Sequence, residues 1–365
     1  MLFFASFSRS NIVFKLSFII TAFTFCVSFG YGYDWINYFE IYDSINKYKV
    51  DYIPFEPGYY YVMKFMSYIN APFQLLHIFT TVLIFSLVYL FCKKMKNKSL
   101  SFFTLFSFMG FFMFIEQVRQ GIAVCIIMLS VGLVSDGKKI KYFIMVLFAI
   151  FFHISAIAGL SYYLLSRKNN VKYGKSIYII ISVGFIEFIL YAFENPSVIS
   201  FIPIIGQKIF LYGLMGNSLN NSLFLKSSLV YIFLIILCFY FQRRESNVGR
   251  DYGKIDGSIY SSLLIWQTKA AFFLQRVQYY AVAPLIMGLD DYFFVRKKFS
   301  LSRIMYSITV LIIAYMPMRF QIYQYSITNP LFITASHSEI WNKIGRRCSD
   351  LLKVDDGNFI IKECN

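Results

Sequence analysis

Residues 72–98 read PFQLLHIFTTVLIFSLVYLFCKKMKNK, an uncharged and largely apolar run that ends in a cluster of lysines. A helix that crosses a bilayer needs roughly 20 mainly apolar residues, and residues 72–92 meet that length. Cytoplasmic loops of membrane proteins carry an excess of lysine and arginine near the ends of their helices. The stretch therefore predicts a membrane-spanning helix whose C-terminal end faces the cytoplasm.

The composition of the whole chain extends this prediction. Of its 365 residues, 58% are hydrophobic, 21% are aromatic and only 15% are charged. In an average soluble domain about a quarter of the residues are charged. This chain has too little polar surface to cover a water-soluble globule, which excludes soluble enzyme folds, disulfide scaffolds and disordered chains. The lipid bilayer is its expected environment.

Similar apolar runs recur along the chain and predict an all-α integral membrane protein, a polytopic helical bundle of about 10–12 spans. The expected spans are residues 12–32, 72–92, 100–116, 119–135, 176–193, 221–242, 258–274, 277–293 and 301–317. Residues 1–318 form the expected membrane domain, with outer loops 33–71 and 194–220, and residues 319–365 form a C-terminal tail.

The apolar stretch 142–165 needs a separate interpretation. Counted as one span, it would place the basic loop Arg167–Lys175 outside and reverse every later loop. A hairpin of residues 142–152 and 154–165, with His153 at its apex, keeps that loop inside. Re-entrant segments of this kind are permitted where they are buried in protein. We expect the hairpin, although a single tilted span is the commoner structure.

Basic side chains give the chain a net charge of +16 and concentrate in the gaps between the apolar runs. They form five clusters: Lys93–Lys98, Lys138–Lys141, Arg167–Lys175, Arg243–Lys254 and Arg296–Arg303. The segment Asp34–Glu56 is instead acidic. With the hairpin, all five clusters fall in the cytoplasm, while the acidic segment and the C-terminal tail fall outside. The charge therefore indicates membrane topology, and nucleic acid is not an expected partner.

Three arginines lie on the side where the positive-inside rule does not expect them. Arg119 and Arg276 each lie in a tight turn between two short apolar runs, and Arg319 follows the last run. An ionisable group at bilayer depth costs roughly 2.5–3.5 kcal/mol or more and usually marks a substrate path. Because a guanidinium matches phosphate oxygens with two parallel hydrogen bonds, the arginines are candidate ligands for a lipid-linked diphosphate.

Each arginine could also have a purely structural role, without binding a substrate. Arg119 follows Glu116 by three residues, so the two side chains could pair on one helix face. Arg276 and Arg319 could extend to the lipid headgroups without a substrate.

His153 and two acidic residues complete the candidate site. His153 lies in an otherwise apolar stretch, where an imidazole is either a general base, a group that orients a hydroxyl, or a hydrogen-bonded core residue. Asp34 and Glu56 lie among tyrosine and tryptophan rings in the outer loop, as in many sugar-binding sites. For these two carboxylates the alternative is a helix cap or an ordinary loop charge.

Motifs for other chemistries are absent from the sequence. Gly249–Lys254 lacks the spacing of a Walker A loop, and there is no GxSxG or HExxH motif. The three dispersed histidines and the cysteine spacings suggest no metal site. We therefore expect no metal and no cofactor, and ATP-driven pumps, zinc proteases and cytosolic nucleotide-sugar transferases are disfavoured.

Short motifs recur in a consistent order between roughly residues 30 and 290. They are Asp34…Tyr38, Glu56-Pro57-Gly58, Arg119-Gln120…Ala123, Phe152-His153-x-Ser155-Ala156, Lys208…Tyr212 and Arg276…Tyr279-Tyr280. In this order they resemble the EpsG family, whose members are similar to the Wzy polymerases of O-antigen and capsule assembly.

This resemblance implies a metal-independent glycosyltransferase of the bacterial inner membrane, similar to the GT-C-like enzymes that use lipid-phosphosugars. Its substrates would be undecaprenyl-diphosphate-linked oligosaccharides, joined on the periplasmic face, with a chain-length regulator as a further partner. Tyr279 and Tyr280 would bind substrate beside Arg276. A flippase for the same lipids, or a membrane acyltransferase with a catalytic histidine, is the competing interpretation.

The residues themselves supply a chemistry for such a transfer. Negative charge grows on the diphosphate as it leaves, and preorganised positive groups stabilise that change. Arg119 and Arg276 would supply it, with Arg319 as a third. The base for the acceptor hydroxyl would be His153 if it faces the cavity, and otherwise Asp34 or Glu56.

Overall fold

The computed structural model describes most of the chain. The described residues are 1–32, 34–48, 55–160, 162, 228–246, 253–270, 275–319 and 327–354, with isolated residues between 180 and 195. The basic cluster Arg167–Lys175, most of the predicted span 176–193 and nearly all of the outer loop 194–220 lie outside them.

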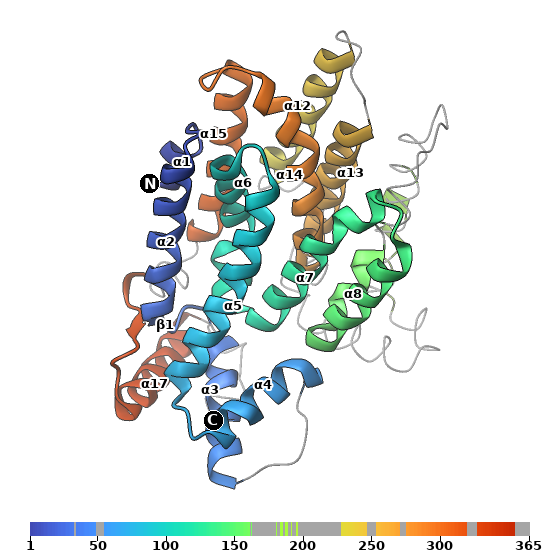
Figure 1. Ribbon diagram of the computed structural model, residues 1–365. Coiled ribbons are helices and arrows are strands. Elements are labelled where there is room, and N and C mark those ends of the chain that lie inside the picture. The colour runs from blue at the N-terminus through green and yellow to red at the C-terminus, as the bar shows by residue number, and fades with distance from the viewer. Residues whose placement is uncertain are drawn as a thin grey trace.

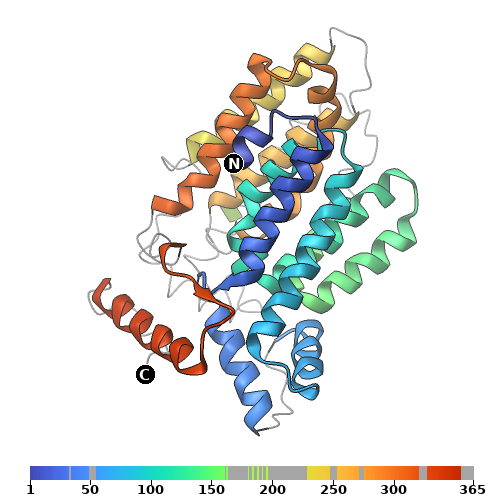
Figure 2. The same cartoon turned by 60° about the vertical axis from the view of Figure 1, so that its left-hand side comes forward.

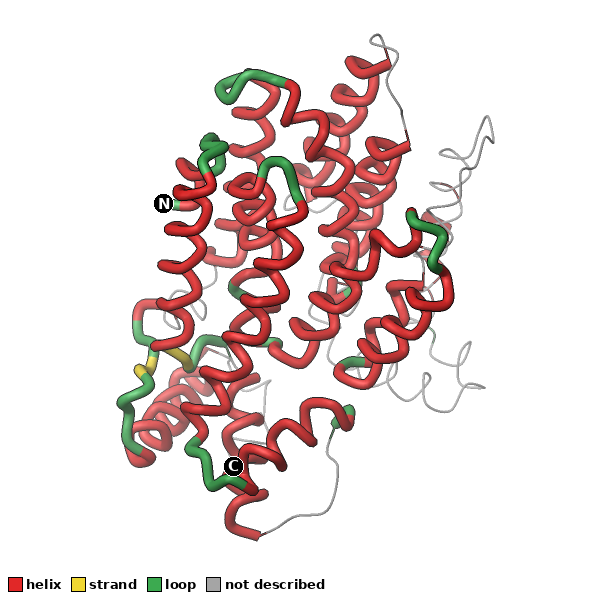
Figure 3. The backbone as a smooth tube through the Cα atoms, viewed as in Figure 1, coloured by secondary structure: helices red, strands yellow, loops and turns green. Residues whose placement is uncertain are grey.

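Helices dominate the described residues (Figures 1 and 3). They are α1 (Leu2–Ala5), α2 (Asn11–Val27), α3 (Asp34–Tyr48), α4 (Pro57–Tyr68), α5 (Phe73–Lys94), α6 (Lys98–Leu105), α7 (Val118–Ser135), α8 (Lys139–Phe152), α12 (Leu229–Ser246), α13 (Gly253–Gln267), α14 (Gln278–Val295), α15 (Leu301–Tyr315) and α17 (His337–Val354). Two short strands, β1 (Ser28–Phe29) and β2 (Leu331–Phe332), form one antiparallel pair. The expected all-α class is confirmed.

The helices differ from the predicted spans mainly at their ends. In the part of the chain that the structure describes, α5 is the one helix long and apolar enough to cross a bilayer. Asn11–Val27, Val118–Val134 and Leu301–Tyr315 are apolar but shorter. The run that begins with α6 continues as π-helical turns, Phe106–Gly110 and Phe112–Glu116, and α13 gives way to a 3₁₀ turn at Thr268–Ala270. The expected number of spans therefore remains a prediction.

The basic turns gather at one end of the bundle. The α5–α6, α7–α8 and α14–α15 connections and the end of α12 all lie at the upper ends of their helices in Figure 1. Helices α3 and α4, the turn into α7 and the end of α8 lie toward the opposite end. The described basic clusters are thus separated from the acidic outer segment by the length of the bundle, as the charge pattern predicts.

A buried polar cluster holds the basic end together. The Asp290 carboxylate of α14 accepts hydrogen bonds from the backbone N–H groups of Lys96 and Asn97, at 2.7 and 2.8 Å. The fully buried Arg303 of α15 donates to the Asn97 side-chain oxygen at 3.3 Å and to the backbone carbonyl of Ser6. Because each of these buried polar groups would be costly without partners, the contacts tie four segments together.

The predicted reversal at His153 is confirmed as far as the described residues extend. α8 ends at Phe152, His153 is extended (φ −159°, ψ 126°), and a 3₁₀ helix follows at Ile154–Gly159. Tyr142, near the start of α8, donates its hydroxyl to the carbonyl of Gly159. The chain therefore folds back along α8 and does not continue as one helix.

The C-terminal segment packs at the end of the bundle that holds α3. β2 pairs with β1, which extends directly from α2, and the Gln74 side-chain amide donates to the carbonyl of Ala335 at 2.8 Å. Figure 2 shows α17 lying beside this end, and the rings of Phe39 in α3 and Trp341 in α17 are 5.5 Å apart. The described part of the tail thus lies far from the basic turns.

Candidate functional site

A polar pocket of about 100 Å³ lies at the end of the bundle opposite the basic turns. It is lined by Asp34, Asn37, Tyr38, Gln117, Arg119, Gln120, His153 and Arg276. A single water molecule needs roughly 10–15 Å³ of such space, so the pocket has room for a polar group of several atoms. Four of the eight residues expected to form the site line this one pocket: Asp34, Arg119, His153 and Arg276.

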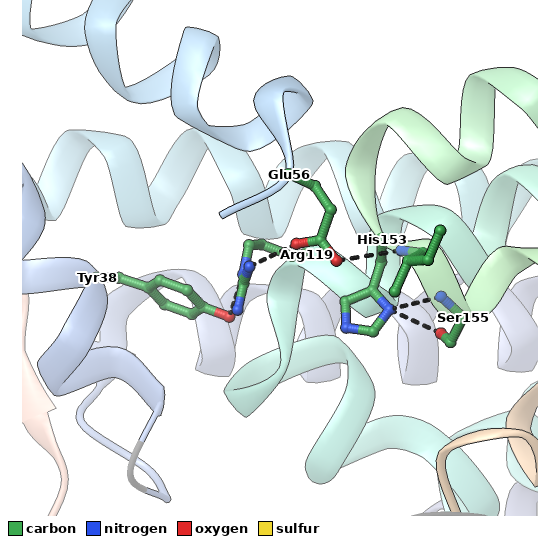
Figure 4. Close-up of polar contacts among 6 residues, drawn as sticks. Tyr38, Glu56, Arg119, His153 and Ser155 are labelled. Carbon is green, nitrogen blue, oxygen red and sulfur yellow. Dashed lines mark hydrogen bonds and ion pairs between the residues drawn. The ribbon is translucent and has the colours of Figure 1, made fainter. Parts of the chain in front are cut away.

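Arg119 is positioned by the start of α7. Gln117, with φ −93° and ψ 57°, ends the preceding π-helical turn, so Arg119 lies in the first turn of the new helix. Its Nη1 is 2.7 Å from Oε2 of Glu56, and its Nε donates to the Tyr38 hydroxyl at 3.3 Å (Figure 4). Its guanidinium also lies over the Phe55 ring, 4.4 Å from the centroid. These contacts hold the group in one orientation.

One alternative from the sequence is thereby corrected. The ion pair of Arg119 is with Glu56, 63 residues away, and not with Glu116 on its own helical run. Glu116 is buried and packs against Gly32, where a Cβ atom would come within 1.9 Å of the Glu116 carboxyl carbon.

Glu56 joins Arg119 to the hairpin apex. It precedes Pro57, the first residue of α4, and its Oε1 accepts a hydrogen bond from the N–H of Ile154 at 3.1 Å. Burial alone raises the pKa of Glu56, but backbone hydrogen bonds and nearby charge, including that of Arg119, outweigh it and lower the pKa. Glu56 does not line the pocket as described. Glu56 therefore positions Arg119, and its expected contact with a sugar stays a prediction.

His153 caps the 3₁₀ helix with its own ring. Its Nδ1 accepts the backbone N–H of Ser155 at 3.2 Å and lies 2.7 Å from the Ser155 hydroxyl. In Figure 4 the opposite edge of the ring, which carries Nε2, faces away from Ser155 toward the side of Arg119. Although His153 is only 8% exposed, it lines the pocket. One edge of the ring is thus structural, and the other faces the site.

Arg276 brings a second guanidinium to the pocket. It lies in the short turn before α14, where its backbone carbonyl accepts a hydrogen bond from the Gln120 side chain at 2.8 Å. Among the described residues, no carboxylate forms an ion pair with its guanidinium. Arg276 is therefore a guanidinium that can bind an anion, and Asp34 places one negative charge in the same lining.

Two expected site residues lie behind the pocket, and the side chain of a third is not among those described. Tyr279 and Tyr280 are buried in α14 and do not line the pocket as described. The Tyr280 hydroxyl is 3.0 Å from the Ser155 hydroxyl, so Tyr280 contacts the turn at His153 and not the pocket. Arg319 ends a 3₁₀ turn at Met316–Arg319, and its side chain lies outside the described residues.

The structure adds four polar residues to the site that the sequence did not assign to it. Asn37 and Tyr38 lie three and four residues after Asp34, so all three side chains share one face of α3. Gln117 and Gln120 flank Arg119. Helical spacing from Asp34 was the signal that could have identified Asn37 and Tyr38.

The family of the chain follows from comparison with known proteins. The model of the EpsG family matches residues 11–333, a range that contains every residue lining the pocket. The chain belongs to the EpsG family. The EpsG family includes Wzy-like polymerases, and with the apolar helices this membership indicates a membrane protein of polysaccharide biosynthesis. No curated protein and no solved structure matches the chain.

Proposed function

We propose that this EpsG-family protein is a glycosyltransferase that polymerises polysaccharide repeat units. In the proposal it is a multi-pass protein of the bacterial inner membrane. It transfers the growing glycan from undecaprenyl diphosphate to a lipid-linked repeat unit on the periplasmic face. One observation carries the proposal: Arg119 and Arg276 line a single pocket together with Asp34 and His153.

The two guanidiniums suit the leaving group of this reaction. As the bond between the anomeric carbon and the diphosphate oxygen breaks, the electron pair leaves on the diphosphate. Fixed positive groups stabilise the growing charge without having to reorganise during the reaction. Arg119 is held by Glu56 and Tyr38, and Arg276 has no ion pair among the described residues, so one cation is oriented and the other is available to an anion.

The distribution of charge supports the periplasmic side. The described basic turns share one end of the bundle, and the pocket lies at the other. Under the positive-inside rule the basic turns face the cytoplasm. The pocket then opens toward the outer leaflet, where a translocated lipid-linked sugar would reach it.

The surface of α8 provides an apolar approach to the pocket for a polyprenyl chain. Six large apolar side chains are exposed along this helix: Ile140, Phe143, Ile144, Leu147, Phe148 and Phe151. They recur at helical spacing, so they form one stripe on one face of the helix. The stripe ends next to His153, which lines the pocket.

The test uses purified protein and an undecaprenyl-diphosphate-linked oligosaccharide, with no added nucleotide or metal. We expect a ladder of products that differ by one repeat unit. The Arg119→Ala, Arg276→Ala double variant is the matched control and should give no ladder. Relocation of the intact lipid across vesicles by the wild-type protein, without a ladder, would support the flippase and reject the polymerase.

A further inference from the structure

Two glutamines in the pocket lining carry side-chain oxygens that accept no hydrogen bond from the described residues. Gln117 and Gln120 both line the pocket, and the Oε1 atom of each is buried without a hydrogen-bond partner among these residues. They lie three residues apart at the start of α7, so the two side chains share one side of that helix. A buried acceptor without a partner costs free energy and is rare in folded proteins. The two oxygens are therefore candidate contacts for a group that the pocket binds.

The orientation of the Gln120 amide is fixed by its nitrogen. Nε2 donates to the backbone carbonyl of Arg276 at 2.8 Å. The reverse orientation would set two acceptor oxygens against each other, because a carbonyl has no proton to donate. Gln120 is only 1% exposed, and it directly follows Arg119 in the chain. Its Oε1 is thus a fixed acceptor next to both residues that bring a guanidinium to the pocket.

A fixed, uncharged acceptor selects the chemistry of its partner. The oxygens of a diphosphate linked to a lipid and a sugar carry no proton at neutral pH, so an amide oxygen repels them and a guanidinium binds them. An amide oxygen instead requires an O–H or N–H group. The lining therefore combines cations that suit a diphosphate with acceptors that suit a sugar, and it matches the junction between the two.

The sugar group closest to that junction is the substituent at the 2-position, on the ring carbon next to the anomeric carbon. In the sugars of polysaccharide repeat units it is a hydroxyl or an acetamido group, and each carries one proton to donate. As the anomeric carbon becomes cationic, a hydrogen bond from the 2-position strengthens. An acceptor placed there favours the transition state over the bound ground state.

We propose that Gln120 is a specificity-determining residue whose Oε1 accepts a hydrogen bond from the 2-position of the sugar attached to the diphosphate. Gln117 supplies a second acceptor to the same sugar ring. Neither glutamine takes part in proton transfer, and the proton at the 2-position stays on its own oxygen or nitrogen throughout. The glutamines therefore select the donor sugar, while the arginines bind its leaving group.

This inference rests on the proposed function and names the part of the donor that the site recognises. The experiment uses two undecaprenyl-diphosphate-linked oligosaccharides, the native one and an analogue with hydrogen in place of the group at the 2-position. Both carry a label in the polyprenyl chain and are mixed with unlabelled native lipid. Release of labelled undecaprenyl diphosphate then reports the reaction of the labelled molecule as donor alone.

The measured quantity is the rate with the native donor divided by the rate with the deoxy donor. In the wild-type protein this ratio should be about 100 or more, because a site built to bond a substrate group discriminates strongly against its absence. Gln120→Met removes the acceptor at nearly constant side-chain volume and should lower the ratio roughly tenfold or more. Any difference in intrinsic reactivity between the two donors is the same in both proteins and cancels in this comparison.

Two further variants separate acceptance from structural support. Gln120→Glu keeps an acceptor oxygen but loses the N–H that holds the Arg276 carbonyl, so it should react more slowly with both donors and keep the wild-type ratio. Gln74→Met is the matched control, because the Gln74 amide also donates to a backbone carbonyl, that of Ala335, and does not line the pocket. It should likewise keep the wild-type ratio. Binding of labelled native donor shows that each variant is folded.

Three results would overturn the inference. They are a wild-type protein that uses the two donors equally well, a Gln120→Met variant that keeps the wild-type ratio, and a Gln120→Glu variant whose ratio falls as far as that of Gln120→Met. The first of these decides the matter even if Gln120→Met does not fold. A wild-type protein that releases no labelled undecaprenyl diphosphate from the native donor would instead reject the proposed function itself.

Discussion

Oε2 of Glu56 lies 2.7 Å from Nη1 of Arg119, although 63 residues separate them in the chain. The same carboxylate accepts the N–H of Ile154, next to His153. Glu56 thus connects the guanidinium that lines the pocket to the apex of the α8 hairpin. A displacement of α4 would disturb both sides of the site together, because α4 begins directly after this residue.

The contacts of the Glu56 carboxylate, first with the backbone N–H of Ile154 and then with nearby positive charge, predict a pH-dependent contribution to stability. The pKa of Glu56 is lowered in the folded protein, so the unfolded chain takes up this proton first as the pH falls. The stabilisation is therefore complete above the ordinary pKa of a glutamate, about 4.5, and is lost as the pH falls through the lower, folded value. Glu56→Gln should have a lower Tm than wild type at pH 7, with a difference that shrinks below about pH 4.5.

Asp136→Asn is the matched control for that measurement. Asp136 forms a 3.5 Å ion pair with Lys138 at the opposite end of the bundle, and both side chains are more than half exposed. An exposed pair contributes little, so this variant should melt like wild type at every pH. A constant gap between wild type and Glu56→Gln from pH 3.5 to 7 would contradict the prediction.

Arg276→Lys tests whether the shape of the cation matters as well as its charge. A lysine keeps the positive charge but cannot make two parallel hydrogen bonds to phosphate oxygens. We expect polymerisation to fall by roughly 10²–10³-fold while the protein remains folded in the membrane. Arg244→Lys, at the end of α12, is the control and should leave the ladder unchanged. Normal product ladders from Arg276→Lys would remove this residue from the proposed mechanism.

Gly32→Ala should disturb the site indirectly, through the packing of Gly32 against Glu116. Gly32 has φ +67°, and a Cβ there would come within 1.9 Å of the Glu116 carboxyl carbon. The variant combines the cost of a left-handed residue, roughly 1–2 kcal/mol, with overpacking of about 1–3 kcal/mol. We expect a large loss of thermal stability and of polymerisation, because Asp34 follows two residues later.

Gly137→Ala separates backbone strain from crowding. Gly137 has φ +73°, close to the value at Gly32, but a Cβ there meets no atom within 4 Å. It should show only the smaller loss, with normal polymerisation. Equal destabilisation by the two substitutions would show that the Glu116 contact contributes nothing.

The side of the membrane that holds the pocket is open to direct measurement. Tyr68, in α4 at the pocket end, is 85% exposed, and Lys138 lies in the basic turn between α7 and α8. A membrane-impermeant maleimide should label Tyr68→Cys in right-side-out vesicles and Lys138→Cys in inverted vesicles. The unmodified protein gives the background from native cysteines. The reverse labelling pattern would place the pocket in the cytoplasm and reject the proposed reaction.

Much of the local structure was predictable because it depends on short-range patterns. The apolar run of α5 and the basic turns follow from composition and charge within a few residues, whereas the break at His153 follows from the side assignment of the later basic loops. The ends of the helices were less predictable. α2 stops at Val27 because the chain extends into β1 and pairs with β2, and that partner lies about 300 residues away.

The sequence by itself determined that this chain is an α-helical membrane protein of the EpsG family, and it identified Arg119, Arg276, His153 and Asp34 as chemically unusual. Only the tertiary structure decided that these four line one pocket, that Glu56 holds Arg119, and which nitrogen of His153 faces the site. The physical reason is that charge and hydrophobicity are properties of neighbouring residues, whereas a binding geometry depends on contacts between segments that packing alone brings together.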